Sequence, residues 1–456
     1  MIQYIKTVML LLTAVAGASV YAQQNTLGSL WLKVEQNYPG IKAAQSAMAA
    51  AVLNEKSVNG NRLPQVKMQI QNSYSTYDGS AGAFYPQPGF FNVSGSAGML
   101  TGAAFSPNTF SSAVLEWDFF SFGKLKKEKE MSHSITNTRI LEKDACLLKL
   151  KKSLSERYIS LIYQEAKLKW NEKNIDRLND IRGITSGLSA AGLKPAADSL
   201  LALSSYMQAL GEADRLGGSR QAALINLSEL LNADTSFNKA PLTKITVPPG
   251  FLSPQTTLNI AHPMLMLLNE QSAYYELSSA FQKRSSLPSL KLLGGYAFRG
   301  SGISEGGYVS GKFRDGFSNT TNNVLAGLGI TWNITDLYTK RIKAGALSKE
   351  AERSKLLTEQ YQQSMQANLS ATAIRIFQQY EQLKKIKTAV EQADAAYNMY
   401  LARYKSGLIN LSELLQIRIL LEQAENNHIE ASKNYWLLLA DEAELTADFN
   451  FLFNNL

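Results

Sequence analysis

The sequence predicts an α+β membrane protein that is built from two copies of one unit, each with two strands and a long helical hairpin. Three observations predict this fold class. Two Gly-Leu pairs, Gly192-Leu193 and Gly407-Leu408, interrupt helix-forming stretches at positions 215 apart, and Trp117 and Trp332 have the same separation. Period-two alternation marks four strands. Apolar residues recur every seven positions in two long segments, which is typical of helices packed lengthwise.

The first residues have the pattern of an export signal. Lys6 precedes an apolar run at 8–15, and Val20-Tyr21-Ala22 forms a cleavage junction before Gln23. We therefore expect residues 1–22 to be a signal peptide. The alternative, a membrane anchor, is disfavoured because the run is short for a span. The junction has no cysteine, as a lipoprotein would require.

Composition limits how the exported chain can enter a membrane. Of 456 residues, 45% are hydrophobic and 18% are charged, and the mean hydropathy of −0.15 is too polar for a bundle of membrane helices. A membrane-inserted part must therefore consist of β-strands. The net charge of +8 becomes +7 without Lys6 and is spread over the surface, and no nucleic-acid partner is expected of an exported protein. Cys146 is the only cysteine and is expected to be a packing residue.

The first repeat is expected at residues 23–234. A helix is predicted from Leu27 to about Asn61, interrupted at 37–39. After Leu63-Pro64 the period changes, and Val66, Met68, Ile70 and Tyr74 alternate with polar residues, as in a membrane-spanning strand.

A Gly-, Ser- and Pro-rich segment at 78–111 is expected to be a long exposed loop. The return strand is predicted at Ala113–Phe120, with Leu115, Trp117 and Phe119 on one face and acidic residues on the other. A soluble hairpin covering a core remains the alternative for these two strands.

A helix is predicted from Gly123 to about Ser189, roughly 66 residues or about 100 Å long. Its heptad stripe implies a left-handed supercoil, and the stripe consists of Ile140, Leu147, Leu154, Leu161, Leu168 and Ile175. Gly192 is expected in the left-handed conformation that ends this helix. The returning helix is predicted from about Pro195 to Asn232, with Pro195 in its first turn.

A proline-rich linker is expected at 235–256, and the second repeat at 257–456. Leu287-Pro288 repeats Leu63-Pro64 at an offset of 224. Strands are predicted around 290–298 and at 324–334, separated by a loop at 300–323. A second heptad stripe follows, made of Leu369, Ile376, Leu383, Val390, Tyr397 and Tyr404. The last helix is predicted from about Leu411 to Asp448.

Four strands leave two unpaired edges, which hydrocarbon does not tolerate, and a closed barrel needs at least eight strands. The chain is therefore expected to oligomerise. A cyclic trimer gives a twelve-stranded β-barrel, four strands per chain, continued by a coiled-coil barrel of long α-helices.

The residues at these positions resemble TolC-like outer-membrane efflux proteins. The export signal, the repeated Leu-Pro pair, the segment Glu116–Lys124 and the segment Tyr404–Leu408 carry the resemblance, which covers essentially the whole mature chain. It implies a homotrimeric channel-tunnel in the outer membrane and the periplasm, whose partners are outer-membrane lipid, a periplasmic adaptor and an inner-membrane efflux or secretion pump.

The resemblance also assigns roles to residues at the hairpin tips. It implies adaptor contacts at Gly192, Leu193, Gly407 and Leu408, and an aperture controlled by Asp198, Tyr404 and Glu413. The chain departs from the family at Ile409, where a lock arginine is expected, and at Gln416, where a second acid is expected. Lys405 or Arg403 is a candidate replacement for that arginine.

The residues themselves leave other interpretations open. Asp198 and Glu413 are each expected in the first turn of a helix, where an acid complements the helix dipole, and Tyr404 continues an apolar stripe. No catalytic, cofactor or metal site is expected, because His133, His262 and His428 are scattered and the glycines follow no phosphate-binding pattern. The chain is thus predicted not to be an enzyme. The rival hypothesis is a non-channel periplasmic coiled-coil protein, structural or adhesive.

Overall fold

The computed structural model describes residues 26–76, 100–232, 245 and 254–456. The expected signal peptide at 1–22 and most of the expected linker at 235–256 lie outside these ranges. The described chain forms two compact units. One contains the described residues of 1–48, 138–269 and 355–456, and the other contains those of 49–137 and 270–354.

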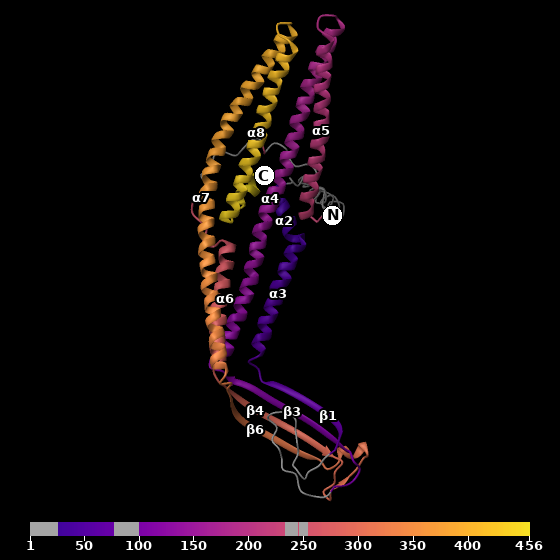
Figure 1. The fold of residues 1–456 in the computed structure, drawn as a ribbon, viewed down its shortest axis with the longest axis vertical. Helices are drawn as coiled ribbons and strands as arrows, with labels where there is room; N and C mark the ends of the chain where they lie inside the picture. The colour runs from indigo at the N-terminus through magenta and orange to yellow at the C-terminus, as the bar shows by residue number, and fades with distance from the viewer. Residues whose placement is uncertain (1–25, 77–99, 233–244, 246–253) are drawn as a thin grey trace, which may run out of the picture. The chain divides into compact units, whose positions relative to one another are not determined.

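The helices lie close to the predicted ranges, and Figure 1 shows their arrangement. Their bounds are α2 Leu27–Asn37, α3 Pro39–Gly60, α4 Lys124–Ala190, α5 Ala196–Leu230, α6 Pro263–Ser285, α7 Asp336–Lys405, α8 Leu411–Thr446 and α9 Asn450–Asn455. In α7 most of the heptad stripe is buried, whereas in α4 full burial is confined to Leu154 and Leu161. Within the described ranges no helix is both long and apolar enough to cross a membrane.

Two helix ends differ from the prediction. Pro195 is the N-cap of α5 rather than a residue of its first turn, and its ψ of 144° is extended. The last helix was predicted to reach Asp448, which is wrong, because Ala447 has a φ of 58° and ends α8 in the left-handed conformation. The short helix α9 follows that turn.

The strands are β1 Gln65–Ser75, β2 Thr101–Gly102, β3 Ser106–Phe120, β4 Ser289–Ser301, β5 Tyr308–Val309 and β6 Thr321–Thr331. Four of them form one antiparallel sheet in the order β1-β3-β4-β6 (Figure 1). The short strands β2 and β5 pair with each other separately. A single 3-10 turn, η1 Phe313–Phe317, interrupts the connection between β5 and β6.

Three strand predictions need correction. β3 begins at Ser106 instead of Ala113, because its polar first half pairs with both β1 and β4 and so completes two hydrogen-bond ladders. The stretch 324–334 is not all strand, since β6 ends at Thr331 and the chain turns there into α7. The segment 300–323 is not only loop, because it contains β5 and η1.

The sheet has one apolar and one polar face in consistent register across all four strands. Val66 lies opposite Leu115, and Leu292 lies between Trp117 and Leu328. The apolar face is strongly exposed, with Met68 at 78% and Val324 at 81%. On the opposite face Lys291 lies 3.6 Å from Asp118 and 4.0 Å from Glu116.

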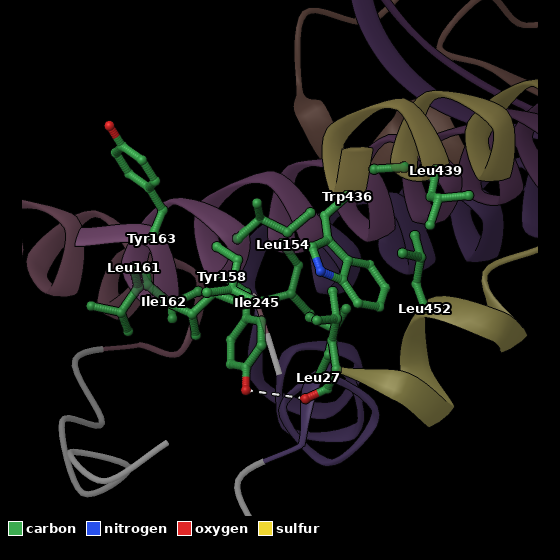
Figure 2. Close-up of a cluster of buried hydrophobic side chains, with 14 of the residues drawn as sticks. Leu27, Leu154, Tyr158, Leu161, Ile162, Tyr163, Ile245, Trp436, Leu439 and Leu452 are labelled. Atoms are coloured by element: carbon green, nitrogen blue, oxygen red, sulfur yellow. Dashed lines mark hydrogen bonds between the residues drawn. The ribbon is translucent and has the colours of Figure 1, made fainter. Parts of the chain in front are cut away.

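The largest apolar core joins α4, α5 and α8 with the two terminal helices α2 and α9 (Figure 2). Leu154, Tyr158, Trp436 and Leu27 are almost completely buried there. The Tyr158 hydroxyl donates a hydrogen bond to the carbonyl of Leu456 at 3.1 Å, shown as a dashed line in Figure 2. This core fixes one end of each helical hairpin and leaves the tips at the other end.

Candidate functional site

The two hairpin tips have the same backbone geometry. Gly192 has a φ of +71° and Gly407 a φ of +75°. At each tip the glycine N–H bonds to a carbonyl three residues earlier and the leucine N–H to one five residues earlier, at 2.9–3.0 Å. This pattern is a Schellman motif, which requires a left-handed residue and therefore favours glycine.

Leu193 and Leu408, which follow these glycines, are exposed at 70% and 69%. In a Schellman motif an apolar residue at this position often packs back on its own helix. Here both leucines point their apolar surface away from the chain instead. The tips thus expose two matched apolar side chains.

Tyr404 lies in a second apolar cluster, which joins the two hairpins near their tips. Its side chain is fully buried beside Ile409, Leu411 and Leu414 of its own hairpin and Ile181 of the other. Among the described residues its hydroxyl has no hydrogen-bond partner. Burial raises the pKa of Tyr404, and the negative charge of nearby Asp198 raises it further. Asp198 therefore lies close enough to Tyr404 to act on it electrostatically.

Glu413 is not part of that pair. It is exposed, its backbone N–H donates to the side chain of Asn410 at 2.9 Å, and Asn410 Nδ2 donates to its carboxylate at 2.7 Å. This reciprocal arrangement is an N-terminal cap of α8. Asp198 also lies in a first helical turn, that of α5.

Ile409 is 8% exposed and belongs to the apolar cluster around Tyr404. Arg403 and Lys405 are exposed, and the guanidinium of Arg403 lies 5.8 Å from the ring of Tyr400. Within the described part of the chain neither cation forms an ion pair with Asp198. Gln416 is exposed as well.

A polar seam between α4 and α8 was missed at the sequence level. It consists of Asn174, Arg177, Arg418, Glu422 and Glu425. Arg177 donates two hydrogen bonds to Glu425, at 2.7 and 2.6 Å. Arg418, which is 8% exposed, donates to Asn174 and to Glu422 at 3.0 Å each. The signal was present as Arg418 and Glu422 at helical i, i+4 spacing, but such pairs usually lie on solvated surfaces.

Burial dominates the electrostatics of this seam. It raises the pKa of Glu422 although Arg418 opposes the shift, and it lowers the pKa of Arg418. The seam therefore holds the two hairpins together through desolvated charges whose partners must be in place. Among the described residues no group of three or more His, Cys, Asp or Glu side chains could hold a metal ion.

Comparison with known proteins agrees with the sheet and the hairpins. The family model described as "Outer membrane efflux protein" matches residues 272–445. No curated protein sequence matches the chain.

Several solved structures have the same fold. The outer-membrane channel OprN is 16% identical with a TM-score of 0.72, covering 94% of this chain and 92% of that one. The Campylobacter jejuni CmeC outer membrane channel is 15% identical with a TM-score of 0.73, covering 92% and 85%. VceC from Vibrio cholerae is 14% identical with a TM-score of 0.73, covering 93% and 97%. The family match and these folds indicate a transport channel and not an enzyme.

Proposed function

Because this chain is a TolC-like outer-membrane efflux protein, with the family sequence in residues 272–445 and the fold of such channels, we propose that it forms a homotrimeric channel-tunnel. The protein is located in the outer membrane and extends into the periplasm. In this proposal the tunnel receives substrates from an inner-membrane pump through a periplasmic adaptor and releases them outside the cell.

The observation that supports the proposal most is the two-faced sheet with its open edges. β1 and β6 are the outermost strands, and within the described residues neither pairs on its outer side. A membrane requires those backbone groups to be paired, so neighbouring copies must supply the missing strands. Three copies supply twelve strands, above the eight that the smallest barrels use.

The exposed apolar face of the same sheet argues against the rival, a non-channel periplasmic coiled-coil protein. Met68, Ile70, Val324, Leu328 and Ile330 are each more than 70% exposed and lie on one face. A continuous apolar surface of this kind is rare on proteins that stay in water. We therefore place this apolar face against the hydrocarbon core of the membrane.

We propose that the tips bind the adaptor through Leu193 and Leu408, with Gly192 and Gly407 setting the turns. The two leucines are exposed to nearly the same extent on turns of the same geometry. An adaptor with a repeated apolar pocket fits such a surface, because two equivalent contacts are made at each chain.

We propose further that Asp198, Tyr404 and Glu413 control the aperture. Three copies of a carboxylate around a narrow entrance concentrate negative potential and resist contraction of the ring. Asp198 is half-buried and accepts no hydrogen bond from a described residue, so its carboxylate is available to a neighbouring copy.

The test is complementation of a strain that lacks this protein, with each adaptor and pump pair from the same genome supplied in turn. We expect the wild-type chain to restore export with at least one pair, and Leu193→Ser/Leu408→Ser to abolish export without lowering the amount of protein in the outer membrane. The matched control is Leu53→Ser/Leu356→Ser, at leucines exposed at 64% and 58% away from the tips. Export by the tip variant at the wild-type rate would contradict the adaptor assignment.

A further inference from the structure

The turn η1 occupies one end of the apolar face of the sheet. Its neighbours are Tyr74, Pro107 and Gly300, at the ends of β1, β3 and β4 that are remote from the helices. Since the helices extend into the periplasm, this end lies at the outer leaflet if the sheet spans the membrane as proposed above. The inference below rests on that placement.

The turn is held tightly in this position. A Cβ on Gly300 would lie 2.5 Å from the carbonyl oxygen of Gly316, and one on Gly316 would lie 3.0 Å from Cβ of Pro107, so only glycines allow the contact. Ser301 N–H donates to the carbonyl of Ser318 at 2.9 Å, and Asn319 Nδ2 donates to the carbonyl of Ile303 at 2.8 Å. The turn is therefore preorganised, which lowers the conformational entropy lost when a ligand binds.

Aromatic rings cover the turn on the apolar side. Phe313 lies 6.4 Å from Tyr74 and 5.8 Å from Phe317, measured between ring centroids. The three side chains are 48–55% exposed. Aromatic residues of this kind mark the level at which a membrane strand leaves the hydrocarbon.

Two cations stand beside these rings. Lys312 and Arg314 flank Phe313 and are exposed, and neither side chain has an ion pair or hydrogen bond with a described residue. The adjacent acid, Asp315, accepts a hydrogen bond from the hydroxyl of Ser310. Its carboxylate is therefore engaged inside the turn and leaves the two cations free for an outside anion.

We propose that η1 and Lys312 form a binding site for the phosphate groups of the glycolipid in the outer leaflet. The guanidinium of Arg314 and the ammonium of Lys312 bind the phosphate, and the guanidinium can do so with two parallel hydrogen bonds. Phe313 and Phe317 pack on the first carbons of the acyl chains. The combination of unpaired cations and aromatic rings on a membrane-facing turn fits an anionic amphiphile. Its phosphate pairs with the cations, and its acyl chains pack on the rings.

The turn packs mainly on the two central strands of the chain's sheet, β3 and β4, and meets the edge strand β1 only through Tyr74. A neighbouring copy that pairs with an edge strand leaves it accessible. This position favours lipid over a second copy of the chain as the occupant.

The experiment titrates the purified, detergent-solubilised full chain with bisphosphorylated lipid A and with dephosphorylated lipid A, and counts bound lipids by native mass spectrometry. We expect the wild type to bind the phosphorylated form at least ~10-fold more tightly, and Lys312→Gln/Arg314→Gln to lose this preference. Inorganic phosphate at ~1 mM is expected not to compete, because it lacks the acyl chains that the phenylalanines contact.

The matched control is Lys349→Gln/Arg353→Gln, which removes the same two charges at exposed positions of α7 and should keep the preference. Equal binding of the two lipids by the wild type, an unchanged preference in the Lys312/Arg314 variant, or displacement by inorganic phosphate would each overturn the site. Conductance of the same preparations in planar bilayers separates the two proposals. Normal channels without lipid preference refute only the lipid site, whereas a wild-type protein that forms no channels refutes the proposed function.

Discussion

The indole Nε1 of Trp117 donates a hydrogen bond to the backbone carbonyl of Arg62 at 2.8 Å. Trp332 repeats this contact in the second half of the chain, donating to the carbonyl of Ser286 at 3.1 Å. Each bond joins a tryptophan, near the helical end of β3 or directly after β6, to the residue that precedes the Leu-Pro pair before β1 or β4. The matched pair shows that the two halves of the chain make the same hydrogen bond at equivalent positions.

We predict that Trp117→Phe and Trp332→Phe each destabilise the protein by about 1 kcal/mol, the usual net value of one hydrogen bond. Thermal unfolding in detergent, followed by near-ultraviolet circular dichroism, measures the effect. Trp170→Phe is the control, because the indole nitrogen of Trp170 has no partner among the described residues. Equal losses in all three variants would show that ring size, and not the hydrogen bond, is responsible.

The ion pair between Arg177 and Glu425 predicts a strong asymmetry between single and double substitutions. The side chains are only 18% and 15% exposed, so Arg177→Met leaves a nearly buried carboxylate unpaired. We expect a loss of about 2 kcal/mol, below the ~3–5 kcal/mol of a fully buried pair. Arg177→Met/Glu425→Met should recover most of this loss.

Arg215 and Glu212 provide the comparison for this pair. They form a similar two-bond contact, at 2.7 and 2.6 Å, but Arg215 is 62% exposed. Arg215→Met should therefore lower the stability much less than Arg177→Met does. A double-mutant cycle on apparent melting temperatures tests both pairs, and equal costs would contradict the role assigned to burial.

His262 predicts a loss of stability in acid. Its side chain is 2% exposed, Nε2 donates to the carbonyl of Glu444 at 3.0 Å, and Nδ1 accepts from the N–H of Met264 at 3.2 Å. Burial lowers the pKa of His262, and the contact with Glu444 offsets this only in part. The folded state therefore binds a proton less readily than the unfolded state. The stability due to neutral His262 is complete above the unfolded-state pKa of about 6.5 and is lost as the pH falls toward the lower folded-state pKa.

Melting temperatures between pH 8 and pH 5 measure this effect. We expect His262→Gln to reduce the pH dependence, because glutamine keeps one donor and one acceptor without titrating. His428 also has a lowered pKa, but it is present in every protein compared and contributes equally to each curve. Parallel curves for wild type and His262→Gln would therefore contradict the role assigned to His262.

The aperture proposal predicts that Asp198→Ala/Tyr404→Phe raises single-channel conductance severalfold and increases antibiotic entry into cells. The physical reason is the loss of a carboxylate that accepts no hydrogen bond from the described residues and that lies close to buried Tyr404. Asp214→Ala/Tyr206→Phe removes the same groups from α5 below the tip and should change neither quantity. Unaltered conductance in Asp198→Ala/Tyr404→Phe would contradict the aperture proposal.

Much of the fold was predictable because it follows from local pattern. The alternation at Val66, Met68 and Ile70 marked β1, and the glycines at 192 and 407 marked both tips. The first half of β3 was not predictable, since Ser106–Ser112 has no apolar alternation and is a strand only through its neighbours.

The candidate site was predictable in part. Asp198 and Tyr404, which the resemblance named together, lie close enough to interact electrostatically, and their role at an aperture stays a prediction. The interhelical partners of Asn174 and Arg177 were not predictable, because the register of α4 on α8 depends on packing between segments about 248 residues apart. Long-range pairing of this kind leaves no periodic signal in one sequence.

The most direct test of the central claim is the mass of the purified, detergent-solubilised protein by light scattering, combined with its conductance in planar bilayers. The proposed channel requires a particle of three mature chains that adds discrete conductance steps. A monomer that stays soluble in plain buffer and adds no conductance would contradict the claim that neighbouring copies complete the sheet.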